Sequence, residues 1–395
     1  MKAVEVFDAY KEHIMPTYTK TPLIFVKGKG SRLWDIHNKP YLDFFPGWGV
    51  GSLGHCHPKV VSAVRDQLGK LLFIPNNYYN LPQARLASRI ARHTFAAKVF
   101  FCNSGAEANE GAIKFSRKFG QGRYEIITFE NSFHGRTLAA ITATGQTKYQ
   151  QGFAPLPEGF RTVPFNDLEA VKRALTPKTV AVLLELIQGE GGINVGRDDY
   201  VRGLRKLCDE HNLLLIVDEV QTGIGRTGKM FCYEHYGITP DIMTLAKALG
   251  GGLPIGMMVV KKDIADTLGP GTHASTFGGG PVVCRAGLAV LKAIQDEKLL
   301  ANAQKMGAYL AVELQALKSA CALIKEIRGK GLMIGVELFV EGKEIVAKCI
   351  EKGLLINCTH DRVLRIMPAL TVTKRQIDAA VKILGNVLKE TRGTT

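Results

Sequence analysis

Two carboxylates follow a strongly apolar run near the middle of the sequence. Leu213–Val217 contains only aliphatic residues over the length of a strand, and Asp218 and Glu219 come directly after it. Because an unpaired carboxylate is costly to bury, two of them at the end of a buried strand are candidates for a binding or catalytic site. A helix cap or a surface turn is the alternative interpretation at this point.

A lysine follows a second apolar run. Ile242–Ala246 leads into Lys247, and Gly250–Gly252 come shortly afterwards. Glycine-rich backbone allows a ligand to approach closely, and partial burial would lower the pKa of the lysine amine. Such a lysine can form a Schiff base with an aldehyde. Taken alone this is weak evidence, because most lysines in such loops are solvated.

Two more segments supply groups that could hold a ligand. Ser104–Glu107 has the Ser-x-x-Glu pattern of a capping box at the start of a helix, where free backbone N–H groups can bind an anion. Phe133 offers a ring for stacking, and Arg136 offers a guanidinium for a carboxylate. A strand-end lysine, a strand-end aspartate, a helix start ready for phosphate and a stacking ring together match the needs of pyridoxal phosphate.

The elements that must position these residues follow from the hydrophobic pattern. Through the centre of the chain, short apolar runs alternate with amphipathic stretches, which predicts a mostly parallel sheet covered by helices on both faces. The predicted strands are Val99–Phe101, Glu125–Phe129, Thr179–Leu184, Leu213–Val217 and Ile242–Leu245. Ligands of such sheets bind beyond the C-terminal ends of the strands, where the residues above lie.

The pattern changes from Pro281 onward and predicts a smaller α+β domain. We expect a large domain over residues 46–280, a small domain over 281–395, and an N-terminal segment, 1–45, packed with the small domain. The elements expected in the small domain are one long helix from Val283 to about Leu317, strands Ile324–Ile327 and Met333–Leu338, and helices Lys343–Lys352 and Lys374–Leu388.

Length and composition exclude several classes of protein. The chain has 395 residues, of which 46% are hydrophobic and 22% charged, as in ordinary globular proteins. It has no apolar stretch of the ~18 residues that a membrane span needs, and its first twenty residues carry charges where a signal peptide would be apolar. Eight scattered cysteines without a Cys-x-x-Cys pair suggest reduced thiols. We therefore expect a cytoplasmic protein.

The net charge of +15 raises the possibility of an anionic partner. The basic residues are dispersed and form no block of five or six, so a nucleic-acid-binding protein is only a remote alternative. Gly223–Lys229 fits the dinucleotide fingerprint and most of a phosphate-binding loop, but Met230 lacks the required hydroxyl, and a plain glycine loop is the better interpretation. His55-Cys56-His57 is interpreted as a loop, and no metal is expected.

Many short motifs in order resemble one family, the class III pyridoxal-phosphate-dependent aminotransferases. The resemblance covers nearly the whole chain and implies the α/β architecture of fold type I, with a mostly parallel sheet in the large domain. The segments that carry it are Tyr41–Phe44, Gly54–Pro58, Asn103–Glu110, Phe133–Thr137, Gln188–Gly192, Asp218–Gly223, Leu245–Gly250, Ser275–Gly279, Arg328–Leu332 and Leu364–Pro368.

The resemblance implies roles around the cofactor, pyridoxal 5′-phosphate. Lys247 resembles the lysine that carries the cofactor and then moves a proton, and Asp218 resembles the partner of the pyridine nitrogen. Gln221 would lie near the phenolic oxygen of the cofactor, and Phe133 would stack on its ring.

The resemblance also implies how the phosphate is held. Gly105 and Ala106 would bind it through backbone N–H groups, and Thr276 would be supplied by a neighbouring subunit. A homodimer would then be part of the active site.

The substrate groups implied by the resemblance are two arginines and their neighbours. Arg365 resembles the residue that binds the α-carboxylate of glutamate or 2-oxoglutarate, and Glu190 resembles the gate that pairs with it when the donor is bound. Arg136 would hold the carboxylate remote from the reacting amine. Ser275 would face the donor, and Trp48 would occupy the donor pocket.

The implied reaction is transfer of the δ-amino group of N2-acetyl-L-ornithine to 2-oxoglutarate, which gives N-acetyl-L-glutamate 5-semialdehyde and L-glutamate, a step of arginine biosynthesis. The alternative is another ω-aminotransferase of the same family, with ornithine, succinylornithine, 4-aminobutyrate or putrescine as the donor.

Overall fold

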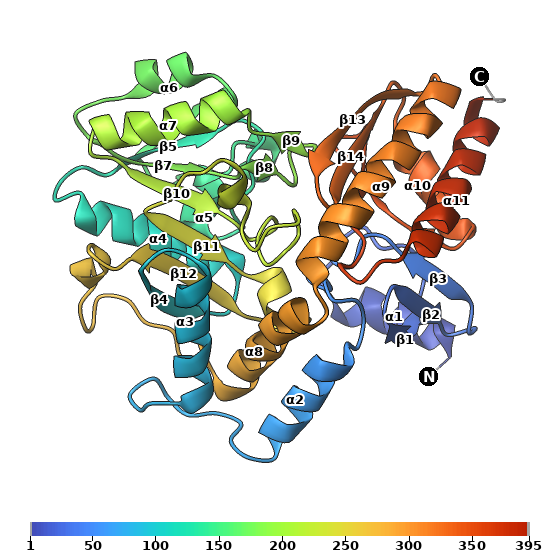
Figure 1. Cartoon of the computed structure of the whole chain (residues 1–395), viewed down its shortest axis with the longest axis horizontal. Helices are drawn as coiled ribbons and strands as arrows, with labels where there is room; N and C mark the ends of the chain where they lie inside the picture. The colour runs from blue at the N-terminus through green and yellow to red at the C-terminus, as the bar shows by residue number, and fades with distance from the viewer. Residues whose placement is uncertain (1, 393–395) are drawn as a thin grey trace.

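A seven-stranded sheet forms the centre of the larger of two bodies, as a computed structural model that describes residues 2–392 shows (Figure 1). Its strand order is β4-β12-β11-β10-β7-β5-β6. The strands are β4 (Ala97–Cys102), β5 (Glu125–Phe129), β6 (Phe160–Val163), β7 (Thr179–Leu184), β10 (Leu214–Asp218), β11 (Ile242–Leu245) and β12 (Gly256–Lys261). Only β12 runs antiparallel to its neighbours, so the predicted mostly parallel sheet is confirmed.

Helices cover both faces of this sheet because successive side chains of a buried strand point to opposite sides. In β7, Val182 and Leu184 belong to one hydrophobic cluster, together with Leu204 of α7 (Asp198–Glu210). Leu183 belongs to another cluster, together with Phe115 of α4 (Gly105–Phe119). A continuous apolar run is therefore what a strand covered on both faces requires.

The first residues of the chain pair with a strand from its last third. One sheet contains β1 (Phe25–Lys29), β2 (Arg32–Asp35), β3 (Pro40–Asp43) and β15 (Leu354–Leu355), with β15 parallel to β3. An antiparallel sheet contains β13 (Ile324–Lys330), β14 (Met333–Leu338), β17 (Val363–Ile366) and β16 (Asn357–Thr359). These pairings support the packing expected for residues 1–45, while the boundaries 1–45, 46–280 and 281–395 stay a prediction.

The single helix predicted over Val283 to about Leu317 is wrong, because the structure has two helices there. These are α8 (Pro281–Asp296) and α9 (Leu299–Ala320), separated at Lys298, whose φ is 52°. The apolar periodicity continues across the break without a glycine or proline, so nothing in the pattern marked it. The turn lets α8 pack against α2 (Pro58–Leu68) and α3 (Leu81–His93) while α9 packs against β13.

The other elements complete the two bodies that Figure 1 shows, with the seven-stranded sheet on the left and β13, β14 and α9 on the right. They are α1 (Ala3–His13), α5 (Leu138–Ala143), α6 (Leu168–Ala174), α10 (Lys343–Glu351), α11 (Lys374–Arg392), β8 (Ile187–Gln188), β9 (Asn194–Val195), and the 3-10 turns η1 (Thr147–Tyr149), η2 (Cys232–His235), η3 (Lys247–Gly250) and η4 (Ala265–Thr267). Across residues 2–392, no helix has both the length and the apolar character needed to cross a membrane.

Candidate active site

A cavity of about 220 Å³ lies where strands of the central sheet end. It brings together seven residues that the sequence singled out from four separate segments of the chain. Its lining residues are Gly105, Ala106, Asn109, Phe133, His134, Gly135, Arg136, Glu185, Asp218, Val220, Gln221 and Lys247. The carboxyl ends of parallel strands meet at one edge of the sheet, which is why residues so far apart in sequence line one cavity.

Lys247 begins the turn that follows β11 and has a left-handed φ of 45°. Burial lowers the pKa of its amine to about 8, although the carboxylates of Glu190, Asp218 and Glu185 act in the opposite direction. An amine with this pKa is half neutral at about pH 8, far below the pH at which an ordinary lysine loses its proton, so it can act as a nucleophile and as a base.

Asp218 is held by three groups at the end of β10. Its Oδ2 accepts from Asn109 Nδ2 at 2.8 Å and lies 2.8 Å from His134 Nδ1, and its Oδ1 accepts from the backbone N–H of Val220 at 3.0 Å. Asn109 is itself fixed, because its Oδ1 accepts from Thr244 Oγ1 at 2.8 Å. The carboxylate is 4% exposed and has one defined orientation.

The start of α4 has the predicted cap. The Ser104 hydroxyl accepts from the N–H of Glu107 at 3.1 Å, and the Glu107 carboxylate accepts from the N–H of Asn103 at 2.7 Å. Gly105 and Ala106, in the first turn, line the cavity, where helix N–H groups have no partner within the helix. A Cβ on Gly105 would lie 2.8 Å from Val220 Cγ1, so a larger residue does not fit without movement.

The buried Arg365 lies beside the cavity in a dense set of contacts. Its Nη1 donates to Glu190 Oε1 at 2.6 Å and to the carbonyl of Gly189 at 2.9 Å. Its Nε and Nη2 both donate to Asn357 Oδ1, at 2.9 and 2.6 Å, and its guanidinium lies 4.8 Å from the Phe45 ring centre. The pairing of Glu190 with Arg365 is thus present, while its role as a gate stays a prediction.

Arg136 is free to take an anion. Its guanidinium stacks on Tyr149, 4.0 Å from the ring centre, and lies 5.3 Å from the ring centre of Phe133. Within the described part of the chain it forms no ion pair, in contrast to Arg365.

Besides Glu190 and Arg365, which lie beside the cavity, three more predicted site residues do not line it. Ser275 Oγ accepts from Asn103 Nδ2 at 3.2 Å and lines a separate cavity of about 360 Å³. Thr276 is exposed. Trp48 is half-exposed and contacts the edge of Phe45, with 5.5 Å between ring centres. The roles of these three residues stay predictions.

Sequence reasoning missed Asn109, His134, Glu185 and Asn357. Asn109 lies four residues after Gly105, on the same face of α4, and that spacing was a usable signal. Asn357 had no such signal, because it meets Arg365 through the register of β16 and β17.

Two other motifs have structural roles. The Gly223–Lys229 loop is packed against the second body, since Arg226 is buried and donates Nη1 to the carbonyls of Leu332 and Pro368. His55 and His57 point to different carboxylates, and no cluster of metal ligands occurs among residues 2–392.

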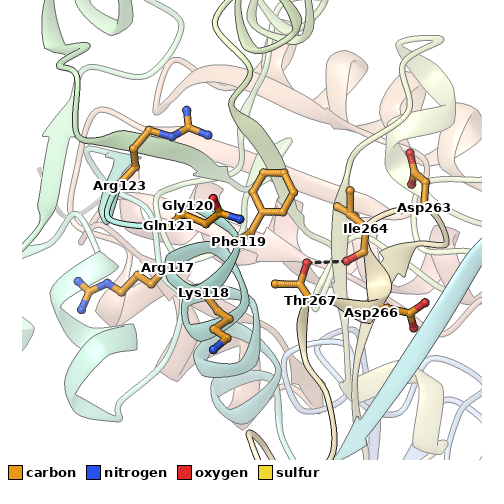
Figure 2. Close-up of a pocket in the computed structure, with 10 residues that line it drawn as sticks. All are labelled: Arg117, Lys118, Phe119, Gly120, Gln121, Arg123, Asp263, Ile264, Asp266 and Thr267. Carbon is orange, nitrogen blue, oxygen red and sulfur yellow. Dashed lines mark hydrogen bonds between the residues drawn. The ribbon is translucent and has the colours of Figure 1, made fainter.

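Another cleft, of about 1100 Å³, lies between the end of α4 and the turn at residues 263–267 (Figure 2). In Figure 2 the side chains of Arg117 and Arg123 point to one side, and those of Asp263 and Asp266 lie on the other. Because these charged groups diverge, the cleft offers no converging polar groups for a ligand.

Comparisons with known proteins agree with this geometry. A family model described as Aminotransferase class-III matches residues 14–388. The chain is 53% identical to an acetylornithine aminotransferase of Caldanaerobacter subterraneus subsp. tengcongensis and 50% identical to one of Methanocaldococcus jannaschii, in each case over 97% of this chain and 98% of the relative. The chain belongs to the class III aminotransferase family.

Solved structures have the same fold as this class III aminotransferase. The ornithine aminotransferase of Toxoplasma gondii ME49 superimposes with a TM-score of 0.96 at 33% identity, covering 100% of this chain and 97% of that one. The acetylornithine aminotransferase of Elizabethkingia anophelis gives 0.88 at 32% identity, covering 99% and 100%. The predicted fold class is therefore confirmed.

The cavity of this class III aminotransferase fits the family cofactor, pyridoxal 5′-phosphate. Gln221 Oε1 and His134 Nε2 are buried without a partner among the described residues, so the site has polar atoms to spare for a ligand. The first turn of α4 suits the phosphate, the Phe133 ring suits the pyridine, and Lys247 suits the aldehyde.

Proposed function

We propose that this protein transfers the δ-amino group of N2-acetyl-L-ornithine to 2-oxoglutarate, forming N-acetyl-L-glutamate 5-semialdehyde and L-glutamate. The observation that carries the proposal is the contrast between the two arginines: Arg136 is free for a carboxylate, whereas Arg365 is paired with Glu190. A donor with one carboxylate needs only Arg136, and an acceptor with two needs both arginines. The names of relatives about half identical over nearly the whole chain support the same substrates.

The chain's own residues divide the work of the reaction. Pyridoxal phosphate, when bound, supplies an electron sink for the carbon that loses a proton. Asp218 keeps the ring nitrogen protonated, Lys247 accepts and returns the proton through its Nζ, and Arg136 binds the remote carboxylate. Glu190 leaves Arg365 when 2-oxoglutarate binds, and the α-carboxylate of 2-oxoglutarate then takes the place of the Glu190 carboxylate on the guanidinium.

Steady-state kinetics with a panel of donors tests the substrate. N2-acetylornithine, ornithine, succinylornithine, 4-aminobutyrate and putrescine are compared with 2-oxoglutarate as the acceptor. We expect acetylornithine to have the highest kcat/KM. A tenfold advantage for another donor would overturn the substrate and leave the family assignment intact.

Replacing Asn357 with leucine should affect the acceptor alone. Arg365 Nε and Nη2 both donate to Asn357 Oδ1, and leucine removes these two hydrogen bonds, which orient the guanidinium. Because hydrogen bonds to a charged group contribute about 1.5–3 kcal/mol, the KM for 2-oxoglutarate should rise about 10- to 100-fold. The KM for the donor should change less than twofold, and an equal rise for both substrates would contradict this assignment.

A homodimer is part of the proposal. Thr276 lies outside the cavity of its own chain, beside the exposed ring of Phe277, which contacts Phe73 at 5.6 Å between ring centres. Leu72, which precedes Phe73, and Tyr79 are exposed as well, and exposed apolar side chains of this kind are typical of an interface. A second copy would cover it and place Thr276 near the cofactor phosphate. Sedimentation equilibrium should give twice the chain mass, and a fully active monomer would contradict it.

We also propose a cytoplasmic location. All eight cysteines are free, which is typical of proteins in reducing compartments.

A further inference from the structure

Glu185 lies directly after β7 and lines the active-site cavity, yet no step described above uses it. Its side chain is buried, with the residue 4% exposed. Its Oε2 accepts from the backbone N–H of Phe133 at 2.9 Å, and its Oε1 accepts from the backbone N–H of Gly189 at 3.0 Å. One carboxylate therefore joins two loops that lie 52 and 4 residues from it in the sequence.

Each of these loops leads to one of the two anion-binding arginines. Arg136 follows Phe133 by three residues, and its guanidinium lies over the Phe133 ring. The carbonyl of Gly189 accepts from Arg365 Nη1 at 2.9 Å. Arg365 itself belongs to β17, in a different sheet from the strands that bear the cavity. The Glu185 carboxylate thus connects the Arg136 side of the site with the Arg365 side, and a bound dicarboxylate would lie between these two arginines.

A carboxylate is the side chain that this position requires. Two N–H groups point at two different oxygens, and a glutamine amide has only one oxygen to offer. Burial raises the pKa of Glu185 above its ordinary value, and Asp218 adds to this, while His134 and the two backbone N–H groups oppose it. Glutamine would fill nearly the same volume without charge, but its NH₂ group would face one of the two backbone donors.

We propose that Glu185 is a positioning residue that sets the span between Arg136 and Arg365 and thereby the length of dicarboxylate that the site selects. This inference rests on the proposed function, in which 2-oxoglutarate offers one carboxylate to each arginine. With both loops held, we expect the span to suit a five-carbon diacid, which is the length of 2-oxoglutarate. With one loop released, the span is no longer defined, and shorter or longer diacids compete with it.

The test is the binding of unreactive diacids to the purified cofactor-loaded protein. Calorimetry measures the Kd of succinate, glutarate and adipate for the wild type and for Glu185→Gln. We expect the wild type to prefer glutarate, and the variant to bind glutarate about tenfold more weakly, because a buried donor loses its acceptor. The ratio of the Kd values of succinate and glutarate should fall toward one, and the KM for 2-oxoglutarate should rise more than kcat falls.

Glu219→Gln is the matched control. Glu219 is equally buried and accepts from two backbone N–H groups, those of Cys232 and Tyr233, both at 2.9 Å, but it does not line the cavity. The two variants should lose similar thermal stability, while the control keeps diacid Kd values within twofold of the wild type. If Glu185→Gln fails to fold, Glu185→Asp is measured instead, because its shorter side chain cannot reach both loops.

Three outcomes would overturn the inference. They are wild-type length selectivity in the Glu185 variant, an equal loss of selectivity in the Glu219 control, and a wild-type protein with no preference among the diacids. The donor panel varies the amino donor and keeps 2-oxoglutarate as the acceptor, whereas the diacid series measures binding without any amino donor. A wrong donor therefore leaves this test intact, and the failures of the two proposals can be told apart.

Discussion

Lys247→Ala should lower kcat by at least about 10³-fold. The variant loses the amine that carries the cofactor and the group that moves the proton, and a positioned acid or base alone contributes about 10²- to 10⁴-fold. Single-turnover conversion of the donor, followed by the visible absorbance of the cofactor, measures the loss. Lys262→Ala, at an exposed lysine just after β12, is the control and should keep wild-type rates. Comparable rates in the two variants would contradict the assignment.

The pKa of Lys247 makes the same prediction testable through pH. Burial lowers this pKa to about 8, so the neutral amine prevails above pH 8 instead of above the ordinary 10.5. The rate at which protein stripped of cofactor binds pyridoxal phosphate should rise with pH, reach half of its maximum near pH 8 and level off about one pH unit above that. A rate that still climbs toward pH 10 would show an ordinary lysine. Borohydride reduction followed by peptide mapping should place the cofactor on Lys247, and active protein unmodified there would refute the site.

Asp218→Asn should lower kcat by about 10²- to 10⁴-fold. Asparagine keeps the shape of the side chain but removes the negative charge that faces the ring nitrogen, and loss of one partner of a buried charge pair costs about 3–5 kcal/mol. The NH₂ group of the amide would also face one of the donors that now serve the carboxylate, either Asn109 Nδ2 or the backbone N–H of Val220. Stopped-flow measurement of the half-reaction with the donor separates this effect from acceptor binding.

Asp263→Asn is the matched control for that prediction. Asp263 is exposed and lines the cleft of Figure 2, where charged groups diverge. It should leave kcat and both KM values unchanged. If the Asp218 variant kept more than a tenth of the wild-type kcat while folding normally, the carboxylate would not be the partner of the ring nitrogen.

The strands that position the site were predictable because a strand that is buried on both faces needs an apolar side chain at nearly every position, which gives a continuous apolar run in the sequence. Thr179–Leu184 and Ile242–Leu245 match β7 and β11 to the residue. Once those strands are known, the edge at which parallel strands end follows from topology, and the functional roles of Asp218 and Lys247 can be inferred. The helix break at Lys298 was not predictable, because the apolar pattern on both sides continues in phase.

The sequence by itself determined which side chains reach the strand-end edge and therefore which cofactor chemistry the cavity suits. Only the tertiary structure decided which hydrogen-bond partners orient these side chains. The bonded pairs are far apart in sequence: Asn109 and Asp218 by 109 residues, Phe133 and Glu185 by 52, and Glu190 and Arg365 by 175. Local patterns record whether a side chain is buried, since burial repeats with the period of the helix or strand. Hydrogen-bond partners carry no such period, because packing between distant elements brings them together.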